Sequence, residues 1–394
     1  MAAPDWIWLV FLFAFGCCIG SFLNVVIYRL PRDKSLVSPP SACPACGRRI
    51  RAYDNIPLIS WLLLGRKCRY CKAPISVRYF AIELLTGLVF VGIFHLYFRT
   101  GLRAGMGPFL GGGWLIYLLH MILLAAFVAA SAIDLELWII PLSICWLVTV
   151  AGLAGSTLAG YIIDPAQIRQ FYLLPSTSDV FLQESTIASL AAGATIGLAV
   201  SLVLVATGLI KRSYEYEGSQ NSHEKPDNDA SAEPQFNHHA EMAREIIFLL
   251  PIIICSALAY WLIRAQALPG SISGWWLNFT QKPAVAGLLG SLWGYFVGCG
   301  IVWATRIFGT LAFRKEAMGL GDVHLMGAAG AVIGPVSVVI AFFVAPFFGL
   351  AWAVCQMFFK KTRQIPYGPF LSFGVFAVMI FHDRIFEYWQ FMRN

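Results

Sequence analysis

Stretches of about 20 apolar residues recur along this 394-residue chain, with short polar segments between them. A helix of roughly 20 residues crosses the hydrocarbon core of a bilayer. Because hydrocarbon offers no hydrogen bonds to an open backbone, these stretches are expected to be helical. The chain is therefore predicted to be an all-α, polytopic transmembrane helical bundle of about 8–10 spans. The predicted spans are 6–28, 79–98, 114–133, 137–161, 187–210, 245–264, 284–308, a short one at 323–334, 336–359 and 367–388.

The first apolar stretch, Trp6–Tyr28, is predicted to be a permanent anchor. Asp5 is the only charge before it, so the basic region that opens a signal peptide is missing. The stretch is also longer than the roughly 7–15 apolar residues of a signal peptide's core. The composition agrees with a membrane protein, because only 12% of the residues are charged, against about 25% in soluble domains.

Positive charge is concentrated in residues 29–78, which hold eleven Lys or Arg and only two acids. Beside membrane spans, such a loop is typical of the cytoplasmic side. Nucleic-acid binding is the other interpretation, but no separate soluble domain follows, so no nucleic-acid partner is expected. Alternation across the spans then puts Asp134 and several more basic residues on the inner side. These residues are Lys211, Arg212, Arg314, Lys315, Lys360, Lys361 and Arg363.

Two polar stretches and one short span complete the topology. Residues 213–244 have almost no large apolar groups and are predicted to form an inner linker; its histidines are interpreted as solvated, with metal binding as the alternative. Residues 162–186 form a predicted outer loop. The span 323–334 is either a short tilted helix or a re-entrant segment, and the second possibility would reverse the orientation of everything after it.

Four cysteines in the basic loop form two C-x-x-C pairs, Cys43 with Cys46 and Cys68 with Cys71. Two such pairs can complete a tetrahedral shell of four thiolates, which suits a structural Zn²⁺. Disulfide or redox pairs are the alternative, but an inner, reducing compartment disfavours stable disulfides. The loop has few residues to build a core, and metal binding can supply the missing folding energy.

Two aspartates stand at the ends of apolar stretches: Asp134 ends one, and Asp322 begins another. Ionisable groups at membrane depth are costly and usually functional. Either residue alone could also be a solvated cap, and Asp is a favoured N-cap. Gly319 and Gly321 leave room beside Asp322 for a peptide backbone. Two facing carboxylates on one side of the membrane are the minimum equipment for peptide hydrolysis, one as base and one as acid.

Six motifs in register give the chain a resemblance to the type IV prepilin peptidase family, the prepilin leader peptidase/N-methyltransferases. The opening segment of the family is similar to residues 20–31, and the four cysteines follow at matching spacing. The other motifs are Arg78-Tyr79 with Glu83-Leu84-Leu85-Thr86-Gly87, Asp134 with Ile140-Pro141, the G-x-G-D signature within Glu316–Asp322, and the closing motif Ile365–Phe370.

The resemblance implies an aspartic endopeptidase that removes the short basic leader of type IV prepilins or pseudopilins, cutting after a glycine. Asp134 and Asp322 would be catalytic, and the four cysteines would bind zinc. Many members then methylate the new N-terminus with S-adenosylmethionine, for which Glu83 and Gly87 are the candidate residues; a buried polar group and a packing glycine are the structural alternatives. The enzyme would be surrounded by membrane lipid in the bacterial cytoplasmic membrane, with its active site and zinc loop facing the cytoplasm.

The chain also departs from the family pattern. His324 stands where Lys is usual, Leu142 where Asp or Asn is common, and Ala317 where glycine is usual. Two extra spans and the linker lie between the aspartate motifs. The predicted organisation is an anchor 1–28, a zinc domain 29–78, helices 79–161 with the first aspartate, an insert 162–283 containing linker 213–244, and helices 284–394 with the second aspartate.

Two other functions are compatible with these residues. An ion or proton-coupled transporter could use the membrane aspartates, but the sequence shows no repeated halves or broken helices in corresponding positions. A zinc-bearing scaffold of a secretion machine is the third possibility.

Overall fold

The computed structural model describes residues 5–103, 108–163, 184–210, 238–267, 269–359 and 366–393, and within these it is helical, without a β-strand. The helices are α1 Asp5–Arg29, α2 Ile59–Leu63, α3 Val77–Phe98, α4 Gly113–Leu137, α5 Leu142–Ile162, α6 Glu184–Ala206, α7 His238–Arg264, α8 Gly270–Thr280, α9 Pro283–Phe313, α10 Leu320–Ile333, α11 Pro335–Phe359 and α12 Gly368–Arg393. Short 3₁₀ turns are η1 Leu30–Arg32, η2 Ala52–Asn55 and η3 Phe109–Gly111.

Each predicted span corresponds to one helix, so the prediction of a polytopic helical membrane protein is confirmed. Among the described residues, nine helices are long and apolar enough to cross a membrane. The exception is α10, with 14 residues. At a rise of 1.5 Å per residue it is about 21 Å long, which is shorter than a hydrocarbon core of about 30 Å.

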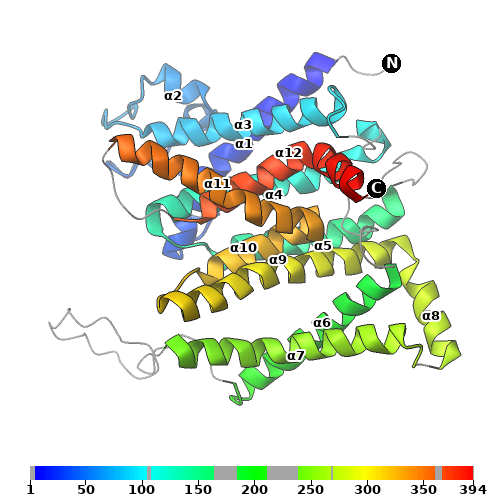
Figure 1. Ribbon diagram of the computed structural model, residues 1–394. Coiled ribbons are helices and arrows are strands. Elements are labelled where there is room, and N and C mark those ends of the chain that lie inside the picture. Colours follow the sequence, from blue (N-terminus) through cyan, green and yellow to red (C-terminus); the bar gives the residue numbers. More distant parts are fainter. Residues whose placement is uncertain are drawn as a thin grey trace.

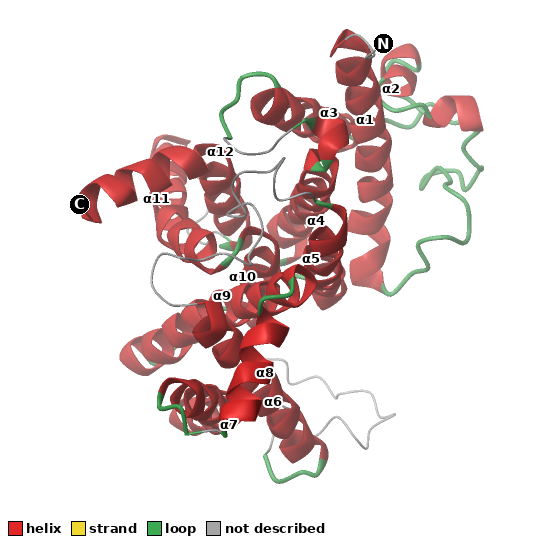
Figure 2. Cartoon of the chain, turned by 90° about the vertical axis from the view of Figure 1, so that its right-hand side faces the viewer, coloured by secondary structure: helices red, strands yellow, loops and turns green. Residues whose placement is uncertain are grey.

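The helices form successive layers (Figure 1). Helices α1 and α3 pack together at one edge, beside α2, and α4, α11 and α12 follow. Next come α5, α9 and α10, and the pair α6–α7 packs on α9 at the opposite edge from α1. Figure 2 shows the same order from the side, with α8 close to α6 and α7.

The short helix α10 lies in the interior, because neighbouring backbones approach it closely. A Cβ added to Gly294 of α9 would lie 2.1 Å from the carbonyl oxygen of Gly330, and one added to Gly152 of α5 would lie 2.9 Å from that of Ala331. Ser291 of α9 also donates a hydrogen bond of 2.6 Å to the Ala331 carbonyl. Small residues at such crossings allow tight packing where lipid supplies no hydrophobic drive.

The region between the aspartate motifs differs in detail from its prediction. Helix α7 begins at His238, so residues 238–244 of the predicted linker are helical, and α8 is a helix that the pattern did not indicate. Residues 164–183 and 211–237 lie outside the described residues, including His223, Lys211 and Arg212. The same is true of 360–365, which hold the basic residues Lys360, Lys361 and Arg363.

Candidate active site and metal centre

The Asp134 side chain lies in the last turn of α4 and is buried, with an exposed fraction of 6%. Its Oδ2 accepts a hydrogen bond of 3.1 Å from the backbone N–H of Gly368, the first residue of α12. The free N–H groups at a helix N-terminus favour a negative group there. A Cβ on Gly368 would lie 2.6 Å from the same oxygen, so this position requires glycine.

Asp322 is the third residue of α10, and the N-cap is Gly319. The interpretation of Asp322 as an N-cap is therefore wrong, because its backbone already belongs to the helix. The side chain is buried at 8% exposure, and its Oδ1 has no hydrogen-bond partner among the described residues. A buried carboxylate oxygen without a partner is costly, which is the pattern of a group held ready for a ligand or for water.

The fold brings the two carboxylates into electrostatic range of each other. Ile140 lies between Gly321, which precedes Asp322, and Gly368, which contacts Asp134. Its side chain would be 2.8 Å from a Cβ on Gly321 and 3.2 Å from a Cβ on Gly368. The prediction that Gly321 opens space for a peptide is therefore wrong, because Ile140 fills that space. Gly321 instead lets the α10 start pack against the segment after Asp134, and the aspartate centre (Asp134, Ile140, Asp322 and Gly368) is compact.

His324, two residues after Asp322, points to another part of the bundle. Its ring is half-buried beside Trp146, at 6.4 Å between ring centroids, and its Nδ1 is 3.5 Å from the Tyr295 hydroxyl. The side chain therefore packs between α5 and α9.

The four predicted ligand cysteines come together in the metal segment, which we define as residues 30–76. Their sulfur atoms all lie within 4.8 Å of one another, and those of Cys43 and Cys71 are 3.8 Å apart. A tetrahedral site with Zn–S bonds of about 2.3 Å implies sulfur separations of about 3.8 Å. All four thiols are free, so the donor set and its spacing fit a zinc ion.

Two similar turns present these thiols. In the first, Gly47 N–H donates to the Cys43 carbonyl at 2.9 Å, and in the second Lys72 N–H donates to the Cys68 carbonyl at 3.1 Å. Both residues have a positive φ, 69° and 61°, which costs little for glycine. Backbone N–H groups of Cys71 and Tyr70 lower the pKa of the Cys68 thiol to about 6, which favours the thiolate that metal binding needs.

The metal segment is fixed to the helices by polar contacts. The Glu83 carboxylate of α3 accepts a hydrogen bond of 2.8 Å from the N–H of Leu58, at the start of α2. Beside this contact, Asn24 of α1 donates to the Tyr79 carbonyl of α3 at 3.1 Å, which joins the two helices that flank the segment. A Cβ on Gly87 would lie 2.6 Å from the Cys17 sulfur, so Gly87 lets α1 and α3 approach. The structure thus gives Glu83 an anchoring contact and Gly87 a packing one.

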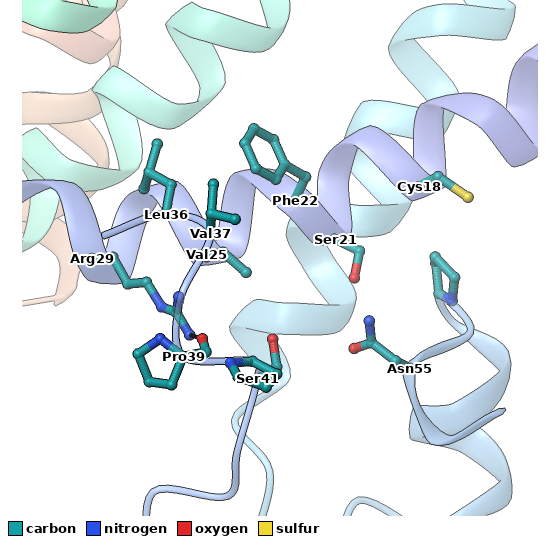
Figure 3. Close-up of a pocket in the computed structure, with 12 residues that line it drawn as sticks. Cys18, Ser21, Phe22, Val25, Arg29, Leu36, Val37, Pro39, Ser41 and Asn55 are labelled. Carbon is teal, nitrogen blue, oxygen red and sulfur yellow. Dashed lines mark hydrogen bonds between the residues drawn. The ribbon is translucent and has the colours of Figure 1, made fainter. Parts of the chain in front are cut away.

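A cavity of about 380 Å³ separates α1 from the metal segment (Figure 3). Ser21 of α1 faces Ser41 and Asn55 across it. Arg29 borders the cavity and holds the loop in place, donating to the carbonyls of Ser35 at 2.9 Å and Pro39 at 2.7 Å. Glu83 of α3 does not line this cavity. Its carboxylate interacts with the side chain of Ser21, which does.

The metal segment and the aspartate centre lie at the same end of the bundle. Arg78, in the first turn of α3, forms an ion pair with Glu136, two residues after Asp134. Because α3 begins directly after the metal segment, this contact joins the two regions.

Sequence reasoning missed one functional candidate, Arg306 of α9. It is fully buried and contacts Glu245, Glu316 and the backbone carbonyl of Met318. The available signal was a charged residue inside the predicted span 284–308, since such residues are rare in membrane helices and usually paired.

Comparison with known proteins finds two family models that match parts of this chain. Residues 14–97 match the bacterial peptidase A24 N-terminal domain, and residues 246–354 match the type IV leader peptidase family. The first match contains the cysteines, Glu83 and Gly87, and the second contains Asp322. Asp134 lies outside both matched ranges.

Individual relatives agree with these matches. The prepilin leader peptidase/N-methyltransferase of Myxococcus xanthus is 47% identical over 152 residues, 38% of this chain and 40% of that protein. The Aeromonas hydrophila enzyme of the same name is 34% identical over 181 residues, covering 40% of this chain and 58% of that protein. A type 4 prepilin-like proteins leader peptide-processing enzyme of Escherichia coli is 28% identical over 382 residues, covering 92% of this chain and 90% of that protein.

The chain thus spans about half the length of two of these relatives and most of the third. No solved structure matches it. The matches favour a peptidase over the transporter and scaffold alternatives.

Proposed function

We propose that this chain, which belongs to the type IV leader peptidase family, is a membrane aspartic endopeptidase. It removes the short basic leader of type IV prepilins or pseudopilins and then methylates the new N-terminus. The observation that carries the proposal is the buried pair Asp134 and Asp322, which the ends of α4 and α10 place within electrostatic range.

The two carboxylates differ in their surroundings, and this difference suggests their roles. Asp134 accepts the Gly368 N–H, a contact that favours a carboxylate, so it is suited to take a proton from the attacking water. Asp322 Oδ1 has no partner among the described residues, so its protonated form is suited to donate to the carbonyl oxygen of the scissile bond. One proton is then shared by the pair, and its titrations belong to both residues together.

The position that we propose for the site, at the cytoplasmic face of the membrane, suits the proposed substrate. Asp134 and Asp322 lie at helix ends next to the basic metal segment, which the positive-inside rule places at the cytoplasmic face of the bacterial inner membrane. A prepilin-like substrate has a basic leader outside the bilayer and an apolar helix within it. Its cleavage point therefore lies at the depth of the aspartate centre.

The peptidase is tested with purified full-length protein and a substrate that has a basic leader ending in glycine before an apolar helix. Asp134→Asn and Asp322→Asn are each expected to lower kcat by about 10²–10⁴-fold, the range of general acid–base catalysis. Bound zinc and thermal unfolding are the controls, and both should stay as in the unmodified protein. Full activity in either variant would refute the mechanism.

For the methylation step, Cys43, Cys46, Cys68 and Cys71 would hold a structural zinc that supplies folding energy to the metal segment. The cavity between α1 and this segment is the proposed site for S-adenosylmethionine, with Ser21, Ser41 and Asn55 as its polar lining. The Glu83 carboxylate, which interacts with Ser21, supplies a negative charge near the substrate amine or near the sulfonium of the methyl donor. Gly87 supports the site by letting α1 and α3 approach.

Methylation is tested with a peptide that already starts at the mature N-terminus, so that cleavage is not required. Asn55→Leu should abolish binding of the labelled methyl donor, measured directly by equilibrium dialysis, while zinc content stays unchanged. Asn278→Leu, the same change at an exposed position of α8 outside the cavity lining, is the matched control. Undiminished donor binding in Asn55→Leu would remove this cavity from consideration.

A further inference from the structure

Helix α7 is joined to the helix before Asp322 by a buried ion pair. Arg306 of α9 has an exposed fraction of 0%, and its Nε lies 3.0 and 3.2 Å from the two carboxylate oxygens of Glu245 on α7. Glu245 is itself 3% exposed, and its second oxygen accepts a hydrogen bond of 2.8 Å from the Trp303 indole. Both charges are thus inside the protein, where an uncompensated charge is very unfavourable.

The other side of the same guanidinium holds the segment that leads into α10. Arg306 Nη1 lies 2.6 Å from Glu316 Oε1 and also donates to the backbone carbonyl of Met318. One turn further along α9, the buried Thr310 hydroxyl accepts a hydrogen bond of 3.1 Å from the N–H of Ala317. The residues from Glu316 to Met318 are therefore fastened to α9 immediately before the N-cap of α10.

The two glutamates are not equivalent partners. The Glu316 side chain is 49% exposed, so solvent screens its charge, whereas the Glu245 side chain is 2% exposed. Glu245 is therefore the partner that neutralises Arg306 within the protein and fixes the plane of its guanidinium. Glu245 belongs to the region that lies between the two aspartate motifs, and no other contact described above gives that region a part in the reaction.

We propose that Glu245 and Arg306 are positioning residues for the peptidase. In this proposal α7 acts as a brace, by which we mean that its Glu245 keeps the Arg306 side chain in place. By holding Arg306, α7 fixes the backbone of residues 316–318 and with it the direction of the Asp322 carboxylate three residues into the next helix. This proposal rests on the proposed peptidase function. Its physical basis is that a shift of about 1 Å in a catalytic group can cost on the order of 10²-fold in rate.

The test uses purified full-length protein and two readouts. The first is cleavage of the prepilin-like substrate, where Glu245→Gln should lower kcat by about tenfold with KM changed less than about twofold, since substrate contacts remain. The second is amide hydrogen exchange over residues 314–321, which should become faster in the variant. Exchange does not depend on activity: if the unmodified protein cleaves nothing, the proposed function fails while the brace can still be judged.

A matched control separates the brace from general damage to α7. Arg244→Gln removes an ion pair of 2.7 Å to Glu241 within the same helix, adjacent to Glu245. It should leave kcat and the exchange of residues 314–321 unchanged. An equal fall in kcat for Arg244→Gln and Glu245→Gln would overturn the proposal, as would unchanged kcat and exchange in Glu245→Gln.

The double variant Glu245→Gln/Arg306→Gln keeps the test decisive if a single variant folds poorly. Removing both charges eliminates the unpaired buried ion, so thermal stability should recover relative to either single variant. A positioning role predicts that kcat nevertheless stays as low as in Arg306→Gln, because the Met318 carbonyl has lost its guanidinium donor. Recovery of kcat together with stability would show that the pair is merely structural.

Discussion

In the metal segment, the outermost ligand cysteines, Cys43 and Cys71, are 28 positions apart, and two short turns present all four thiols. In the aspartate centre, Asp134 and Asp322 are 188 positions apart, and the packing of α4, α10 and α12 on one another brings them into electrostatic range. Local turns position the thiols of the first site, and a metal bound there would supply folding energy. The second depends on backbone-to-backbone contacts in the bundle. A substitution that disrupts one region should therefore leave the structure of the other unchanged.

The largest expected effect on the bundle comes from Gly294→Ala. Its new Cβ would lie 2.1 Å from the Gly330 carbonyl oxygen, so α9 and α10 must separate. Overpacking of this kind costs about 1–3 kcal/mol, and cleavage should fall with it. Unfolding in detergent measures the loss, and the zinc content should stay at the unmodified value.

Gly300→Ala is the control for this change, because it lies on the same helix and faces open space. It should be neutral or stabilising by up to about 1 kcal/mol, the difference in helix propensity between glycine and alanine. Loss of zinc in Gly294→Ala would contradict the independence of the two regions.

A more local effect is expected from Gly368→Ala. The added methyl group would lie 2.6 Å from Asp134 Oδ2, so the carboxylate must turn away from the α12 N-terminus. Cleavage should fall by about 10–10²-fold with little change in unfolding. Gly349→Ala serves as control, since its Cβ meets Phe370 at an ordinary 3.6 Å; similar activity in both variants would contradict the assigned contact.

The reverse experiment removes the metal. Cys46→Ser, or a chelator, should reduce zinc from about one ion per chain to none and abolish methyl transfer, because the cavity wall formed by residues 36–57 loses its support. Cleavage should fall less than about tenfold, since the contact described between the two regions is the ion pair of Glu136 with Arg78, which belongs to α3 and not to the metal segment. A complete loss of cleavage would show that the regions are coupled.

The smallest effect is expected from Asp54→Asn, which breaks the two-pronged contact with Arg69 at 2.6–3.1 Å. Arg69 is 44% exposed, so solvent screens the pair although the Asp54 side chain is buried, and zinc release to a chelator should quicken by only about twofold. Arg69 lowers the pKa of Asp54, so the contact is fully present above the carboxyl's ordinary pKa of about 4 and is lost only as the pH falls through the lowered value. The difference from the unmodified protein should therefore be equal at pH 6 and pH 8.

Predictions from sequence succeeded where the signal is local. The lengths of the apolar stretches predicted the helices. The C-x-x-C spacing predicted that the four cysteines lie together, and Gly47 was expected at the turn after the first pair. Predictions failed where the neighbour is distant in sequence. Asp322 is not a cap because Gly319 precedes it in that role, and the space beside Gly321 holds Ile140 from the segment between α4 and α5. The start of α7 was also misplaced, since polar residues at a helix end resemble a linker.

By itself, the sequence determined a polytopic helical membrane protein with a four-thiol metal segment and two candidate carboxylates, because hydropathy and ligand spacing act over a few neighbouring residues. Only the tertiary structure decided that Asp134 and Asp322 lie within electrostatic range, that Gly368 contacts the first, and that Arg306 joins α7 to the segment before the second. These contacts arise from helix packing, where the partner of a residue is set by the whole bundle and not by its position along the chain.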